Sequence, residues 1–250
     1  MTIPGSLHFW TWIWIALAAV TFVVLLLRTA PYGRYANESW GPTVPHRLGW
    51  IVMEFVSPLA LIMLYLNAES DFAPGIILLA GLWIAHYLHR ALIYPFRARW
   101  AGKNMPVVIM LSAIFFNSVN GSLNGIALSH LDTSGFWTAW TTWLGLSLFV
   151  FGAATNLLAD TQLIRLRQSG DSGYQIPQGN LFKWISCPNY LGELVEWTGF
   201  AIVAGTLPAL SFAIWTAANL VPRAMAHHQW YRDQFPSYPS GRKAIIPFIL

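Results

Sequence analysis

The chain has 250 residues, of which 56% are hydrophobic and only 10% are charged, and its mean hydropathy is +0.49. A soluble domain carries about 25% charged residues, so this composition excludes an ordinary soluble domain and predicts an all-α polytopic membrane protein. The net charge of +4 does not indicate a nucleic-acid partner, because the basic residues follow the membrane pattern described below. The single cysteine, Cys187, excludes an internal disulfide framework and any cysteine-based metal cluster.

Seven apolar runs predict seven transmembrane helices in one domain spanning residues 1–250, since each span needs ~20 residues. The runs cover residues 8–28, 49–66, 74–96, 105–125, 136–158, 191–207 and 208–223. No basic residue precedes the first run and no small-residue cleavage site is evident, so we interpret it as a retained span and not as a signal peptide.

The basic residues all fall on one side of this seven-span arrangement. They are Arg28, Arg34, Arg47, Arg90, Arg97, Arg99, Lys103, Arg165, Arg167, Lys183, Arg223, Arg232, Arg242 and Lys243. The opposite loops carry Glu69, Asp71 and Asp132 instead. Because basic loops stay in the cytoplasm, we expect the N-terminus outside and the C-terminus inside. The excess of Arg over Lys favours a bacterial inner membrane, with the endoplasmic reticulum as the alternative for a eukaryotic chain.

Two polar side chains in the second and third spans are candidate functional groups. Glu54 lies about one turn inside the cytoplasmic end of its span, where a charge costs several kcal/mol unless it has a role or a partner. Tyr87 lies too deep for an interfacial position, although a hydrogen bond to a backbone carbonyl would also explain it. Beside Tyr87, His86 and Arg90 share a helix face. The histidines are a weak metal signal, and we expect no metal.

The fourth span carries an amide stripe, because Asn117, Asn120 and Asn124 are spaced as one face of a helix. Such amides either join transmembrane helices or line a polar cavity.

Polar residues also gather at the cytoplasmic ends of the last three spans. They are Asn156, Asp160, Arg165, Arg167, Asn189, Tyr190, Glu193, Glu196, Arg223, His227 and Tyr231. The acids also suit a helix N-terminus, and the cations also suit cytoplasmic anchoring. Arginine binds phosphate through two parallel hydrogen bonds, so the cluster also suits an anionic ligand. The sequence has no Rossmann, Walker or nucleophile-elbow motif, so a nucleotide would bind without a Rossmann domain.

These residues resemble the steroid 5α-reductase family, the 3-oxo-5α-steroid 4-dehydrogenases. The strongest matches are Asn156-x-x-x-Asp160, Tyr174-x-Ile176-Pro177-x-Gly179, Ser186-x-x-Asn189-Tyr190-Leu191-Gly192-Glu193, Glu196-Trp197-x-Gly199, Arg223-Ala224, His227-His228 and Arg242-Lys243-Ala244-Ile245-Ile246-Pro247-Phe248. Sparser matches in the first half are Trp50, Glu54, His86-Tyr87-x-His89-Arg90 and Asn120-Gly121.

The resemblance implies a seven-helix membrane enzyme that reduces the C4–C5 double bond of a 3-oxo-Δ4 steroid with NADPH. It implies a substrate-binding half, 1–125, in which Glu54 and Tyr87 hold the ketone, and we add Trp50 and Asn120 to the expected substrate site. It implies an NADPH-binding half, 126–250, with cofactor contacts from Asn156, Asp160, Arg167, Tyr174, Asn189, Glu193, Arg223, His227 and Tyr231. Gln175 and Ala226 depart from the basic residue and the histidine that relatives often carry there.

Other functions stay open at this point. A sterol C14 or C7 reductase differs only in the alkene reduced. An isoprenylcysteine or phospholipid methyltransferase would bind S-adenosylmethionine, which has no phosphate for the arginines. A lipid-binding receptor or transporter is the non-enzyme alternative, although no internal repeat supports a transporter.

Overall fold

The computed structural model describes residues 4–30, 33–35, 40–66, 73–98, 100, 102–168 and 174–250. Glu69, Asp71, Arg99 and the Arg34 side chain lie outside this described part. The helices are α1 (Gly5–Leu27), α2 (His46–Leu66), α3 (Pro74–Leu88), α4 (Tyr94–Arg97), α5 (Val107–Ser129), α6 (Trp140–Gln168), α7 (Pro188–Ala204) and α8 (Leu207–Gln234). A π-helical turn, His89–Ile93, joins α3 to α4 without a break.

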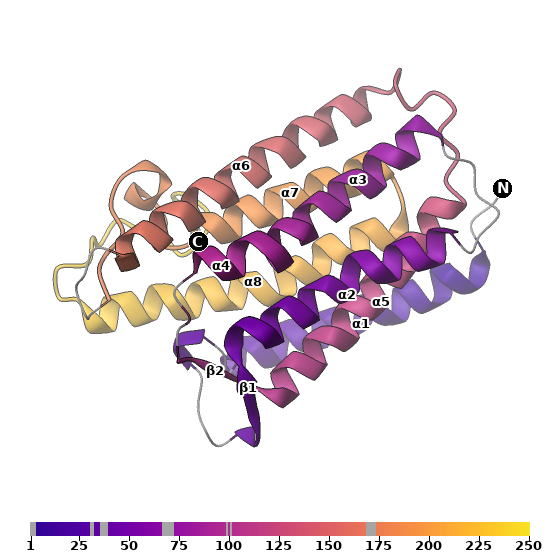
Figure 1. Ribbon diagram of the computed structural model, residues 1–250. Helices are drawn as coiled ribbons and strands as arrows, with labels where there is room; N and C mark the ends of the chain where they lie inside the picture. Colours follow the sequence, from indigo (N-terminus) through magenta and orange to yellow (C-terminus); the bar gives the residue numbers. More distant parts are fainter. Residues whose placement is uncertain are drawn as a thin grey trace.

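The helices form an elongated bundle in which successive long segments run in opposite directions (Figure 1). The most extensive contacts join α6 to α7 and α2 to α5, followed by α1 to α8. The start of α1 and the C-terminal segment lie at opposite ends of the bundle (Figure 1). We call the end that carries the C-terminal segment the C-terminal end.

Within the described residues, five helical segments are long and apolar enough to cross a membrane: 5–27, 46–66, 74–97, 107–129 and 140–167. α7 has only 17 residues, fewer than the ~20 that a span needs. The second half of α8 carries Arg223, His227, His228 and Arg232. An integral membrane protein is therefore indicated, while seven spans and the orientation of the termini stay predictions.

Two long helix ends and a small sheet differ from the sequence prediction. α6 continues ten residues beyond position 158, and α8 continues eleven beyond position 223. The prediction ended each helix where apolar periodicity stopped, but these polar turns stay helical. The predicted loops also contain β1 (Thr43–Pro45) and β2 (Asn104–Pro106), which pair antiparallel with Val44 opposite Met105. The prediction of an all-α chain missed this small sheet.

Glycines at a seven-residue spacing let α6 and α7 touch along their backbones. A Cβ atom at Gly152 would lie 2.2 Å from the Glu196 nitrogen, and one at Gly192 would lie 2.4 Å from the Asn156 nitrogen. Gly145 and Gly199 face each other in the same way, with a Gly199 Cβ 2.5 Å from the Gly145 oxygen. Small residues allow this close helix approach in membranes, and here it fixes α7 against α6.

An aromatic core fills the half of the bundle away from the C-terminal end. Trp83 of α3 is fully buried, with ring centroids 5.0 Å from Trp197 and 4.7 Å from Phe212. The Trp83 indole nitrogen donates to the Ser57 hydroxyl at 3.1 Å, so its one polar atom is satisfied inside the core.

Candidate active site

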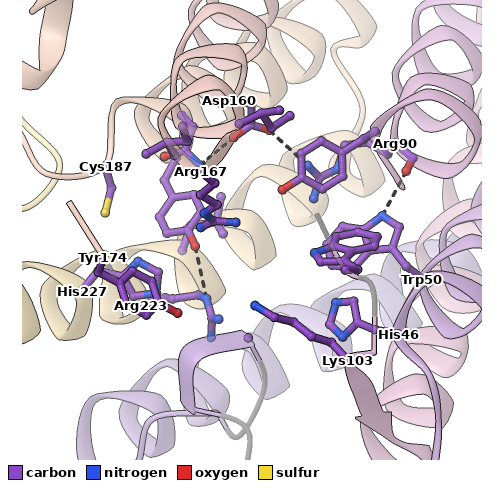
Figure 2. Close-up of a pocket in the computed structure, with 18 of the residues that line it drawn as sticks. His46, Trp50, Arg90, Lys103, Asp160, Arg167, Tyr174, Cys187, Arg223 and His227 are labelled. Atoms are coloured by element: carbon purple, nitrogen blue, oxygen red, sulfur yellow. Dashed lines mark hydrogen bonds and ion pairs between the residues drawn. The ribbon is translucent and has the colours of Figure 1, made fainter. Parts of the chain in front are cut away.

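A cavity of about 740 Å³ opens at the C-terminal end, between the helix ends and the β1–β2 sheet. This volume lies within the range of small-molecule and cofactor sites. Figure 2 shows that its walls come from segments far apart in the sequence. Its main lining residues are His46, Trp50, Arg90, Tyr94, Trp100, Lys103, Asp160, Arg167, Tyr174, Asn189, Glu193, Arg223, His227 and Tyr231.

The structure brings the expected cofactor residues together. Eight of the nine line this one cavity: Asp160, Arg167, Tyr174, Asn189, Glu193, Arg223, His227 and Tyr231. The ninth, Asn156, lies behind the wall, where its amide donates to the Asn189 carbonyl at 3.0 Å and lies 3.5 Å from Glu193 Oε2. Asn156 therefore orients two lining residues.

Cations surround the open space in the cavity. In Figure 2 the side chains of Lys103, Arg167 and Arg223 reach toward the same volume from three different segments. The Arg223 Nε atom donates to the Tyr190 hydroxyl at 3.2 Å, which fixes the direction of the guanidinium. Grouped cations of this kind suit the phosphate oxygens of a dinucleotide.

Asp160 provides an acceptor in the same wall. Its Oδ1 atom accepts from the Asn189 amide at 3.0 Å. Its buried Oδ2 atom accepts no hydrogen bond among the described residues, and Arg90 Nη1 lies 3.6 Å away. A buried carboxylate oxygen without a donor is costly, so this atom suits a hydroxyl or amide donor from a ligand. Together, the acceptor atom of Asp160 and the cations of the cavity fit a dinucleotide, which carries ribose hydroxyls and phosphates.

Aromatic rings form the opposite wall. The rings of His46, Trp50, Tyr94 and Trp100 pack on one another, with His46 and Trp100 centroids 4.6 Å apart and Trp50 and Trp100 centroids 5.2 Å apart. Trp50, an expected substrate residue, thus lies in the cavity wall. Flat apolar surfaces of this kind can hold a planar ring.

Glu54 and Tyr87 do not line the cavity but lie at one helix interface just beyond it. Arg90 of the cavity wall lies 3.9 Å from Glu54 Oε1. The buried Tyr87 hydroxyl donates to Asn117 Oδ1 at 3.3 Å. The Ser57 hydroxyl is close to the Tyr87 hydroxyl, and the charge of Glu54 acts on it as well. The two expected catalytic groups therefore lie on α2 and α3, two helices that pack against each other.

Asn120, the remaining expected substrate residue, faces another way. Its Oδ1 atom accepts from the Trp14 indole at 3.1 Å, and its Nδ2 atom donates to the Phe116 carbonyl. It is 1% exposed and packs α5 against α1. The structure therefore does not bring Asn120 to the cavity or to Glu54 and Tyr87.

Three groups in or against the site were not among the expected catalytic, substrate or cofactor residues. Arg90 lines the cavity between two carboxyl groups, Lys103 reaches in from the residues before β2, and Tyr190 holds Arg223. His86, next to Tyr87, turns instead to Glu196 of α7, with Nδ1 and Oε1 2.7 Å apart. The charge of Arg90 within the predicted span 74–96 was a sequence signal that could have marked it.

The C-terminal segment holds one lip of the cavity in place. The Ser186 hydroxyl lies 2.6 Å from His228 Nδ1, 2.7 Å from the Tyr238 hydroxyl and 3.1 Å from the Lys243 carbonyl. Burial, followed by the positive charge of Arg232, lowers the pKa of His228. The imidazole is therefore neutral near pH 7 and can accept from Ser186. We call Ser186, His228, Tyr238 and Lys243 the clasp.

Comparison with known sequences points to one family. The family model described as 3-oxo-5-alpha-steroid 4-dehydrogenase matches residues 103–250. The chain is 38% identical to "Steroid 5-alpha-reductase DET2" of Arabidopsis thaliana over 92% of this chain and 91% of the relative. It is 41% identical to "3-oxo-5-alpha-steroid 4-dehydrogenase 1" of Homo sapiens over 87% of this chain and 85% of the relative. The bovine protein of the same name is 39% identical over 94% of this chain and 93% of the relative.

The chain belongs to the 3-oxo-5-alpha-steroid 4-dehydrogenase family. Membership in this family makes it an oxidoreductase. The family match over residues 103–250 includes every expected cofactor residue and the whole clasp. The 3-oxo-5-alpha-steroid 4-dehydrogenase relatives also align across the first half, where Glu54 and Tyr87 lie.

Proposed function

We propose that the protein reduces the C4–C5 double bond of a 3-oxo-Δ4 steroid to the 5α product, with NADPH as the hydride donor. One observation carries the proposal. A cavity walled by Lys103, Arg167 and Arg223 adjoins, through Arg90, a partly buried carboxyl and a buried phenol on neighbouring helices. Family membership supports a steroid reductase over the methyltransferase and transporter alternatives.

The cofactor residues divide by chemistry. Lys103, Arg167 and Arg223 would hold the phosphates of NADPH, and Asp160 and Asn189 would bind hydroxyl or amide groups. The bound cofactor supplies the hydride. The cytoplasmic end of the bundle, where these residues lie in the predicted orientation, gives the soluble dinucleotide access.

Glu54 and Tyr87 would act on the substrate ketone. When hydride adds to C5, negative charge develops on the C3 oxygen as an enolate. A protonated Glu54 and the Tyr87 phenol are hydrogen-bond donors in a water-poor interface, where such bonds stabilise charge more strongly than in water. The Asn117 amide donates to the Met53 carbonyl at 2.7 Å, which directs its oxygen toward Tyr87 and positions the phenol.

The direct test is oxidation of NADPH by the purified protein. We expect the loss of absorbance at 340 nm to depend on testosterone or progesterone, with the 5α-reduced steroid as the product. The matched controls are the corresponding 5α-reduced steroids, which lack the alkene, and sterols with isolated C7 or C14 double bonds. Reduction of only the isolated alkenes would select the sterol reductase alternative, and retention of S-adenosylmethionine would select a methyltransferase.

The clasp gives a second prediction. Removing the hydroxyl in Ser186→Ala leaves buried partners without a hydrogen bond, at a cost of about 1–3 kcal/mol. We expect the Kd for NADPH, measured by tryptophan fluorescence, to rise roughly tenfold, while kcat at saturating NADPH changes little. Ser112→Ala, which removes an exposed hydroxyl bonded to its own helix, is the control. Equal NADPH affinities in the two variants would show that the clasp does not order the cavity lip.

A further inference from the structure

Arg90 is held as a fixed cation between the cavity and the Glu54 interface. The π-helical turn that contains it turns its side chain toward both. Its Nη2 atom lies 3.9 Å from Glu54, and its Nη1 atom lies 3.6 Å from Asp160. The guanidinium stands 4.9 Å from the Trp50 ring centroid and 4.8 Å from that of Tyr94. The Trp50 indole donates to the Arg90 carbonyl at 3.0 Å, which locks the turn.

Three carboxyl groups from three helices act on this cation. They are Glu54 from α2, Asp160 from α6 and Glu193 from α7. The charges of Arg90, Glu193 and His86 in turn act on Glu54. His86 itself is paired with Glu196. Arg167 also acts on Asp160, and a carboxyl group in a water-poor site keeps its proton unless cations or hydrogen-bond donors stabilise its charged form.

The hydrogen bonds decide which carboxyl group keeps its proton. Asp160 Oδ1 accepts a hydrogen bond from the Asn189 amide at 3.0 Å, and the Asp160 carboxylate lies closer to Arg90 than the Glu54 carboxyl does. Glu193 has the Asn156 amide 3.5 Å away. Among the described residues, Glu54 has no polar partner in contact except Arg90. Amide donors stabilise a charged carboxylate, so the acid form falls to Glu54.

We propose that Arg90 is a positioning residue that acts through Glu54, by stabilising the carboxylate left when Glu54 passes its proton to the substrate oxygen. This inference rests on the proposed function. As C5 receives hydride from the reduced nicotinamide, the C4–C5 π pair moves to form C3=C4, and the carbonyl pair moves onto oxygen. The Glu54 O–H bond breaks and an O–H bond forms on the substrate.

The enol then returns to the ketone. C4 takes a proton from solvent, the enol oxygen releases its proton to Glu54, and Arg90 is again beside a neutral acid. The balance is one enone, one NADPH and one proton consumed, with one saturated ketone and one NADP⁺ formed. Arg90 gains most of its electrostatic interaction after Glu54 has lost its proton, so it favours the charged state over the resting state.

The test compares Arg90→Gln and Arg90→Lys with Arg165→Gln, which removes an exposed arginine of α6 outside the cavity wall. We expect Arg90→Gln to lower kcat about tenfold or more at saturating NADPH and steroid. The alkaline limb of its kcat profile should move about one pH unit or more upward, because a carboxyl without a neighbouring cation keeps its proton longer. Arg90→Lys should restore much of the kcat and of the wild-type position of the alkaline limb. Arg165→Gln should change neither the kcat nor the position of the alkaline limb.

A readout independent of turnover separates this inference from the proposed function. The infrared C=O band of protonated Glu54, assigned by its loss in Glu54→Gln, should disappear at higher pH in Arg90→Gln than in the wild-type protein. An unchanged midpoint overturns the inference whether or not the wild-type protein reduces a steroid. A rise in the Kd for NADPH with kcat and its alkaline limb unchanged also overturns it, because Arg90 would then be a cofactor contact alone. The infrared shift in Arg90→Gln, together with a wild-type protein that reduces no enone, refutes the proposed function instead.

Discussion

Replacing Tyr87 with phenylalanine, or Glu54 with glutamine, is expected to lower kcat by about 10²–10³, the usual cost of losing one donor to an oxyanion. Phenylalanine keeps the ring that packs on Trp83 but removes the hydroxyl. A glutamine amide cannot release a proton to an enolate, so Glu54→Gln removes the proton donor. Because the two groups act on one oxygen, the double variant should lose less than the product of the single losses.

Binding of NADPH separates a catalytic defect from a folding defect in these variants. Glu54 and Tyr87 lie outside the cavity wall, so the Kd for NADPH should stay within about twofold of the wild-type value. Tyr65→Phe is the matched control, since Tyr65 is equally buried in the core but lies three turns from Glu54 along α2. Wild-type rates of testosterone and progesterone reduction in both single variants would show that these residues do not hold the ketone.

Gly152→Ala is expected to cause the largest loss of stability. The added Cβ would meet the Glu196 nitrogen at 2.2 Å and the Gly192 oxygen at 2.6 Å, and both are backbone atoms that cannot rotate away. α6 and α7 must therefore separate, at a cost of about 3 kcal/mol or more, which exceeds the usual range for an overpacked core. Such a change lowers Tm by roughly 10 °C in a chain of this size. NADPH binding should weaken as well, because α7 carries Asn189 and Glu193.

Gly81→Ala provides the matched control. A Cβ at Gly81 meets nothing within 4 Å, and the residue is exposed in the middle of α3. Alanine in a helix interior is more favourable than glycine by about 0.5–1 kcal/mol, so Tm should stay the same or rise slightly. A Gly152→Ala protein as stable as Gly81→Ala would contradict the tight contact between α6 and α7.

The sequence by itself determined the membrane class, the long helices and most residues of the site. Apolar runs must bury themselves in lipid, and polar residues inside such runs are costly, so both stand out without any structure. This reasoning marked Glu54, whereas Asp160, Arg167 and Arg223 stood out as polar residues gathered at the ends of the runs. It failed at the far ends of α6 and α8, because apolar periodicity stops at their polar last turns although the helix itself continues.

Only the tertiary structure decided which of these residues meet. Asn120 and Asn117 lie three residues apart on α5, yet one joins α5 to Trp14 and the other orients Tyr87. The difference depends on which helix each amide faces, and spacing along one helix cannot specify that. The place of Arg90 between Glu54 and Asp160 likewise depends on a π-helical turn and on the packing of α2 and α6 around it. Long-range packing creates these contacts, so no local pattern could have indicated them.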